Sequence, residues 1–247
     1  MLYPKSNEIR AIIDLGGIWE FKLSKETDIS KELPDDIMKD SELIAVPASY
    51  NDQKENPAYR NHCGWALYQR EVLIPTCHNG QRLVLRFDAV THKARVYLGG
   101  QFLCEHKGGF LPFEIDVTDR LEAGAPAVLT VAVDNRVDHS TLPVGNENGT
   151  AFFGSDNPWV PSVAAAKEWR DPQNFPNFDF FNYAGINRPV RLYTTPKSYI
   201  KDVALVPDVK ETDGILHYTV DIIGQREDGQ TVTLTVFDDA GHEVARG

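Results

Sequence analysis

The sequence predicts an all-β protein built as an antiparallel β-sandwich. Most of the chain consists of short runs in which apolar and polar residues alternate, the period of half-buried strands. No long amphipathic helix is evident, and strands do not alternate with helices as they do around a parallel sheet. Turn residues separate the runs at a spacing typical of sandwiches and barrels.

The first predicted strand, residues 18–23, follows Gly16-Gly17 and places Trp19 and Phe21 on one face. The hairpin signal Gly99-Gly100 predicts a two-residue turn between two later strands. The further strands expected in this part of the chain are residues 43–46, 65–74, 82–88, 94–98, 101–105, 113–117 and 128–133.

The connecting segments are less regular. Residues 26–40 are charged and are compatible with a short helix, and residues 48–64 are expected to form a loop. Residues 119–124 suggest a helical turn that ends at Gly124. Residues 137–174 are rich in Asn, Gly, Pro and aromatic residues, and within them 161–169 suggest a short helix that begins with proline.

A boundary is expected at Pro196-Lys197, after a strand at residues 190–193. Beyond it, strands are predicted at residues 199–206, 215–223, 231–237 and 242–245. We therefore predict two domains, residues 1–196 and residues 197–247. Four strands are too few for a closed sandwich, so we expect the second domain to be only the first part of one.

Composition narrows the class of protein. The 247 residues carry a formal net charge of -11, which argues against nucleic-acid binding because that requires a basic surface. Three cysteines without CxxC spacing favour a reducing compartment over a disulfide framework. The first residues contain no apolar stretch typical of a secretory signal, and no window suggests a membrane span. We expect a soluble, cytoplasmic protein.

The usual catalytic and metal-binding motifs are missing from the sequence. The seven histidines show no HxH or HxxxH spacing, so we expect no metal site. There is no GxSxG or GxxxxGK[ST] motif, and we expect no cofactor. Cys63 beside His62 and Cys77 beside His78 are more typical of packing than of a nucleophile with its base. Asp134 and Asp138 are expected to lie at strand ends.

The stretch from Phe175 to Val190 contains the best candidate for a binding residue. Five aromatic residues lie within four positions of one carboxylate, that of Asp179, in a stretch that also contains glycine and proline. Asp179 either caps backbone N–H groups in a turn or accepts hydrogen bonds from a polyol beside aromatic faces, and the residues alone leave both readings open. Asn146-Glu147 looks like the acid/base step of many glycosidases, but its polar surroundings favour a solvated turn.

Several segments resemble the N-terminal domain of glycoside hydrolase family two. The similar segments are Gly17-Ile18-Trp19-Glu20-Phe21, residues 46–52, residues 68–72, residues 85–92 and residues 108–114. Asp179-Phe180-Phe181-Asn182-Tyr183-Ala184-Gly185-Ile186 and residues 192–196 narrow the resemblance to bacterial-type β-glucuronidases.

The resemblance implies a galactose-binding-like jelly roll, then an immunoglobulin-like sandwich, then a catalytic TIM barrel that this chain does not contain. In the family, two barrel glutamates hydrolyse β-D-glucuronides with retention, so we expect no catalytic residue in this chain. The aspartate of the matching segment contacts sugar hydroxyls, and the resemblance transfers that substrate-binding role to Asp179. We also expect the intact protein to be a homo-oligomer and the 247-residue chain to be inactive by itself.

Two other functions remain open at this point. A sister β-galactosidase or β-mannosidase would share the same scaffold. A free-standing carbohydrate-binding module would bind sugar without a barrel.

Overall fold

The computed structural model describes residues 3–138, 140–143, 181–224, 229 and 231–247. Two compact units make up the chain, Met1–Thr194 and Thr195–Gly247. Each is described by itself below. Asp179, Asn146, Glu147 and the helix expected at 161–169 lie outside the described residues.

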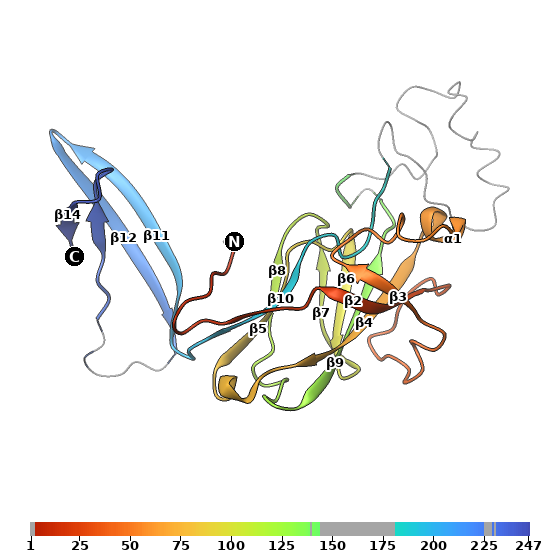
Figure 1. Ribbon diagram of the computed structural model, residues 1–247. Helices are drawn as coiled ribbons and strands as arrows, with labels where there is room; N and C mark the ends of the chain where they lie inside the picture. Colours follow the sequence, from red (N-terminus) through yellow and green to blue (C-terminus); the bar gives the residue numbers. More distant parts are fainter. Residues whose placement is uncertain (1–2, 139, 144–180, 225–228, 230) are drawn as a thin grey trace, which may run out of the picture. The chain divides into compact units, whose positions relative to one another are not determined.

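The first unit contains two antiparallel sheets (Figure 1). The six-stranded sheet has the order β3-β2-β4-β9-β6-β7, with β2 (Gly17–Leu23), β3 (Glu42–Val46), β4 (Trp65–Leu73), β6 (Lys93–Leu98), β7 (Gln101–Lys107) and β9 (Pro126–Asp134). The four-stranded sheet has the order β1-β10-β5-β8, with β1 (Ile12–Asp14), β5 (Arg82–Phe87), β8 (Phe113–Asp116) and β10 (Val190–Thr195). The predicted all-β sandwich is confirmed.

The core shows the alternation that the sequence predicts. Trp19 and Phe21 are buried, whereas Ile18, which directly precedes Trp19, is 62% exposed. Across the other sheet, Leu85 and Phe87 point into the same core. Each such buried side chain contributes on the order of 2–3 kcal/mol, so this apolar layer is the main stabilising feature of the unit.

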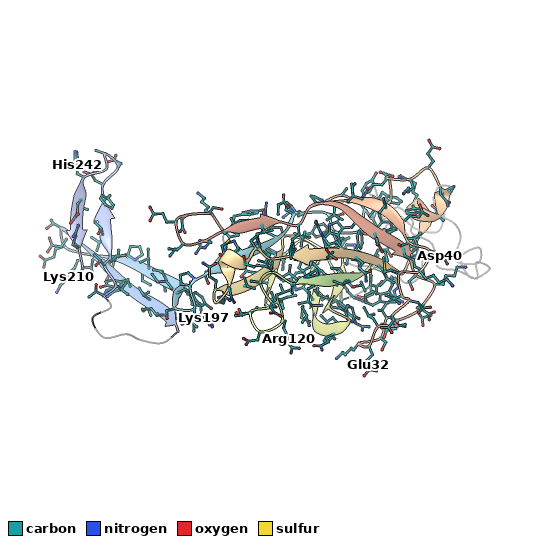
Figure 2. The ribbon with its side chains drawn as sticks, turned by 60° about the horizontal axis from the view of Figure 1, so that its bottom comes forward. Glu32, Asp40, Arg120, Lys197, Lys210 and His242 are labelled. Atoms are coloured by element: carbon teal, nitrogen blue, oxygen red, sulfur yellow. The ribbon has the colours of Figure 1, made fainter. Side chains whose placement is uncertain are left out.

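The outer face of the six-stranded sheet is also covered. Ile29 and Met38 pack on Trp65 and Leu67, whose side chains lie on the opposite face of β4 from the core residue Tyr68. This explains why the start of β4 is a continuous apolar run and does not alternate. Figure 2 shows Glu32 and Asp40 labelled on the covering segment.

The helix expected at residues 26–40 does not form; the segment contains turns and one bridge, between Glu32 and Gln101. Side chains of the sheet donate hydrogen bonds to the backbone carbonyls of this segment. The Tyr97 hydroxyl donates to Ser30 O at 2.7 Å, and Lys22 Nζ donates to Ile37 O at 3.2 Å. These tertiary contacts replace the internal hydrogen bonds that a helix would need.

The loop expected at residues 48–64 contains a short helix, α1 (Pro57–Asn61). Asn56 caps it by accepting a hydrogen bond from Ala58 N at 2.9 Å, and proline occupies the first helical turn. Thr76–His78 form a 3-10 turn, η1. Residues 119–124 form turns and no helix, although Leu121 N does donate to Val117 O at 3.1 Å.

The predicted hairpin between β6 and β7 is confirmed. Leu98 pairs with Gln101 across Gly99 and Gly100, which have φ of 55° and 75°. Positive φ at both central residues is the geometry that glycine adopts without strain.

A network of charges lies on the face of the four-stranded sheet that points away from the core. Arg86 Nε donates to Asp88 Oδ1 at 2.7 Å and Arg86 Nη1 donates to Glu114 Oε1 at 2.8 Å. Arg191 also donates to Asp88. The Tyr3 ring lies over both guanidinium groups, with its centroid 5.4 Å from Arg86 Cζ. Because opposite charges and hydrogen bonds surround Arg86, its burial is tolerated.

The second unit consists of two antiparallel pairs, β11 (Tyr199–Lys210) with β12 (Asp213–Ile223) and β13 (Thr235–Phe237) with β14 (Glu243–Arg246). Figure 2 marks Lys197 and Lys210 near the two ends of β11. β11 runs beyond the predicted 199–206 and carries Pro207 within it, and the strand predicted at 231–237 is shortened to β13. That this unit is immunoglobulin-like stays a prediction.

Among the residues that the structure describes, no helix is long and apolar enough to cross a membrane.

Candidate functional site

Residues 181–187 precede β10 and directly follow the segment that contains Asp179 in the sequence. Two loops hold their backbone. Tyr50 N donates to Ala184 O at 3.1 Å, and Ala48 N donates to Ile186 O at 3.0 Å. On the other side, Thr91 N donates to Gly185 O at 2.9 Å, within an antiparallel bridge. We call residues 181–187 the anchored segment, because strand-like hydrogen bonds hold it from both sides.

Gly185 allows this close packing. Its φ is 124°, and a Cβ atom at this position would lie 2.5 Å from the Tyr68 hydroxyl oxygen and 3.2 Å from Tyr50 Cδ1. Any L-residue side chain here would therefore collide with the aromatic core. The glycine lets the anchored segment lie directly on Tyr68 and Tyr50.

Asparagine side chains join the anchored segment to the sandwich. Asn51 Oδ1 accepts from Ala184 N at 2.8 Å, while Asn51 Nδ2 donates to Tyr59 O at 3.0 Å. One buried amide thus connects α1 to the anchored segment. Asn187 Nδ2 donates to Thr91 Oγ1 at 2.9 Å. Such amides satisfy a backbone group on each side, which irregular chain at a sandwich end otherwise lacks.

Asn182 makes a second connection, to two further loops. Its Nδ2 donates to Asn135 O at 2.8 Å, and its Oδ1 lies 2.5 Å from His92 Nε2. Asn135 is itself held at the loop before β4, since its Nδ2 donates to His62 O at 2.7 Å and its Oδ1 accepts from Gly64 N at 2.7 Å.

One aromatic ring of the anchored segment contacts α1, and a second ring packs on the first. The Phe181 ring lies under the Arg60 guanidinium, 4.2 Å from Cζ to centroid, and edge-on to the Tyr183 ring at 4.9 Å between centroids. Tyr183 is 44% exposed. A cation over an aromatic face contributes about 0.5–1 kcal/mol at such a partly exposed place, enough to favour one ring position.

The other residues considered from the sequence have local roles. Asp134 ends β9, and both of its carboxylate oxygens accept from Arg136, each at 2.8 Å. Asp138 accepts from Lys93 Nζ at 2.9 Å. The Ser140 hydroxyl, followed by Lys93, holds the pKa of Asp138 well below its usual range. Both carboxylates thus pair with cationic side chains of their own surroundings.

The His62–Cys63 pair does not form a nucleophile and base. His62 Nε2 lies 2.9 Å from Trp65 O, and burial lowers the pKa of His62. Burial also raises the pKa of the Cys63 thiol to about 11, so the thiolate is scarce at neutral pH. The three cysteines form no disulfide. Within the described part of the chain, no cluster of His, Cys, Asp and Glu is suited to a metal ion.

The family model for the sugar binding domain of family 2 glycosyl hydrolases matches residues 12–196. The chain belongs to this family. The two-sheet sandwich is consistent with this sugar binding domain, and the match confirms the resemblance to family 2 that the sequence motifs indicated. The charge network, the anchored segment and both sheets lie within the matched residues.

Solved structures of β-glucuronidases align with the entire chain. The Faecalibacterium prausnitzii β-glucuronidase is 55% identical with a TM-score of 0.82, and the chain covers 40% of it. The Bifidobacterium dentium β-glucuronidase, complexed with coumarin-3-O-glucuronide, is 48% identical with a TM-score of 0.81 and is likewise covered over 40%. In both comparisons all of this chain is aligned.

Curated β-glucuronidase sequences are also similar to this chain. The β-glucuronidase of Streptococcus agalactiae is 34% identical over 97% of this chain and 37% of its own length. That of Sus scrofa is 32% identical over all of this chain and 38% of its own length. The chain thus spans less than half the length of the relatives it matches.

Sequence reasoning did not single out His92, Asn51 or Asn135. Each stands in or beside a loop next to a strand, where an asparagine or histidine is usually a turn residue. Their signal in the sequence is weak, because each acts on a segment that follows at least forty-odd residues later in the chain.

Proposed function

We propose that this chain is the N-terminal portion of a retaining β-glucuronidase and that it supplies scaffold and one substrate contact. The observation that carries the proposal is the extent of the similarity. The family model ends at residue 196, whereas the alignment to β-glucuronidases continues through the second unit to cover all of the chain. The solved structures and curated sequences described above are β-glucuronidases, which favours this activity over a sister activity.

Asp179 is the residue that we assign to the substrate. A carboxylate accepts hydrogen bonds from sugar hydroxyls, and charge makes such bonds stronger than those between neutral groups. It would repel the carboxylate of a glucuronide, so the hydroxyls are its partners. The anchored segment supports this role, since the chain two residues after Asp179 is held at Phe181 by Arg60 and at Asn182 by two hydrogen bonds.

The bond-breaking groups lie elsewhere in this proposal. Retaining glycosidases use two carboxyl groups about 5–5.5 Å apart, one as acid/base and one as nucleophile. By family resemblance these are glutamates of a barrel outside this chain. The 247-residue chain is therefore expected to hydrolyse no glucuronide by itself.

The test is an activity panel on the full-length product of the gene that contains this sequence. It should hydrolyse an aryl β-D-glucuronide with much higher kcat/KM than the matching β-galactoside or β-mannoside, and the 247-residue chain should hydrolyse none. Preference for the galactoside or mannoside would assign the sister activity instead. Turnover by the 247-residue chain of verified mass would overturn the placement of the catalytic groups.

Asp179→Ala tests the contact itself. Loss of a charged hydrogen bond to substrate is expected to lower kcat/KM by roughly 10- to 100-fold while the thermal midpoint stays unchanged. The matched control is Asp239→Ala, in an exposed turn of the second unit. An unchanged kcat/KM in Asp179→Ala would leave only the reading of Asp179 as a turn residue.

A carbohydrate-binding module without hydrolysis is the second candidate, and the description of the matched family as a sugar binding domain favours it. This candidate requires the 247-residue chain to bind glucuronate or an oligosaccharide saturably in a calorimeter. Under the leading proposal half of the site is missing from that chain, so the titration should show no saturable heat.

A further inference from the structure

His92 and Asn182 form a hydrogen bond whose direction the surroundings determine. Asn182 Nδ2 lies 2.8 Å from Asn135 O, and a backbone carbonyl can only accept, so the amide nitrogen faces Asn135. The amide oxygen of Asn182 therefore faces His92 Nε2, at 2.5 Å. His92 must donate from Nε2, and this selects one tautomer of the ring.

The second ring nitrogen of His92 supports the same assignment. Nδ1 is buried and meets no hydrogen-bond partner among the described residues. The backbone of Gly109 closes this side, because a Cβ atom on residue 109 would lie 2.9 Å from Nδ1. A proton on Nδ1 would be buried without an acceptor, which is unfavourable. A neutral ring with its proton on Nε2 satisfies the contact with Asn182 and leaves no buried N–H at Nδ1. Burial also lowers the pKa of His92, which favours the neutral ring.

The bond joins three places that are far apart in the sequence. His92 precedes β6, Asn135 follows β9, and Asn182 lies in the anchored segment. The residue before Asn182 is Phe181, whose ring is held between Arg60 and Tyr183. Two successive residues are thus restrained, one by hydrogen bonds from the sandwich and one by ring contacts with α1.

We propose that His92 is a positioning residue: by donating from Nε2 to Asn182 it fixes the anchored segment at a residue three positions after Asp179 in the sequence, and it affects the substrate only through Asn182. This inference rests on the proposed function of Asp179. The alternative is that the His92 ring only fills space beside Gly109. The two roles differ in which substitution of His92 preserves function: a ring without a donor, or a donor without a ring.

The test uses four variants of the full-length gene product. His92→Phe keeps a ring but removes the donor, His92→Gln keeps an N–H donor near the position of Nε2, Asn182→Leu removes the acceptor, and the fourth combines His92→Phe with Asn182→Leu. The control is His78→Gln in η1, where His78 bonds to Gln81 and not to the anchored segment. Each is assayed for kcat and KM with an aryl glucuronide and for its thermal midpoint.

If His92 acts through Asn182, His92→Phe should lower kcat/KM about tenfold or more, as misplacement of a contact residue does. His92→Gln should retain activity within about threefold of the native protein, and the double variant should be no worse than the poorer single variant. Equal damage from His92→Gln and His92→Phe, additive losses, or full activity of His92→Phe would overturn the proposal.

A second measurement separates this inference from the proposed function. In the 247-residue chain, amide hydrogen exchange at Ala184 and Gly185 should accelerate at least about tenfold in His92→Phe and stay native-like in His92→Gln. If the native full-length protein hydrolyses no glucuronide, the proposed function fails while this result still decides whether His92 holds the anchored segment. Unchanged exchange in His92→Phe would overturn the positioning role whatever the activity.

Discussion

The Tyr68 hydroxyl oxygen lies 2.5 Å from the point where a Cβ atom on Gly185 would stand. Tyr68 is fully buried in the core, and Gly185 has a φ of 124°. The close packing of the anchored segment therefore requires that residue 185 has no side chain, because the buried Tyr68 ring occupies the space beside it.

Gly185→Ala should consequently lower the free energy of unfolding by about 2–4 kcal/mol, because left-handed strain and overpacking combine. Urea unfolding measures this. Gly80→Ala is the matched control, since Gly80 has a φ of 79° but nothing within 4 Å of its Cβ position. It should cost only about 1 kcal/mol. Equal losses for the two variants would show that the contact with Tyr68 is unimportant.

Stability should fall as the pH drops through the range of histidine titration. Burial lowers the folded-state pKa of both His92 and His62. An unfolded histidine titrates near 6.5, so below about pH 6.5 the unfolded chain binds protons that the folded chain does not. The contribution of these two neutral histidines to the free energy of unfolding is therefore fully present above this pH. It decreases as the pH falls from there to the lowered folded-state pKa.

Urea midpoints between about pH 7.5 and 5.5 would measure this dependence. His92→Gln should flatten it, because one of the two groups is then removed. A steeper or unchanged slope in His92→Gln would contradict the assignment of His92 as a buried neutral ring.

The charge network should be sensitive to the loss of one member. Asp88→Asn removes the buried carboxylate that pairs with the Arg86 guanidinium and with Arg191, and Glu114 remains as a partner of Arg86; Arg86 is 1% and Asp88 2% exposed. Breaking a buried pair in this way costs about 3–5 kcal/mol. Glu105→Gln is the control, because Glu105 pairs with Arg95 but is 52% exposed, and this change should cost about 0.2–1 kcal/mol. Similar midpoints for both variants in thermal unfolding would contradict the role of burial.

The three cysteines should differ in reactivity. Cys77 is exposed, whereas burial raises the pKa of both Cys63 and Cys104 to about 11. Because the thiolate is the reactive form, iodoacetamide near neutral pH should modify Cys77 first, as peptide mass mapping would show. All three should react alike in denaturant, and early labelling of Cys63 in the folded protein would contradict the structure.

Much of the sandwich could be predicted from alternation, because one buried face imposes a period of two on a strand. Trp19 and Phe21 face the core as predicted, and Gly99-Gly100 forms the predicted hairpin. Alternation is absent where a strand is buried on both faces, as at Trp65 to Tyr68. It also gave no guide to residues 29–37, where side chains of the sheet donate hydrogen bonds to backbone carbonyls and no helix forms. Asn56-Pro57 is a helix-start signal, although residues 48–64 as a whole predict a loop.

The sequence by itself determined the all-β class and the family, since these depend on local period and on short motifs. Only the tertiary structure identified the anchored segment. Hydrogen bonds from residues near 50, 91 and 135 to residues 182–186 leave no local pattern, because their partners are distant along the chain. The need for glycine at 185 likewise comes from Tyr68, a residue more than a hundred positions away.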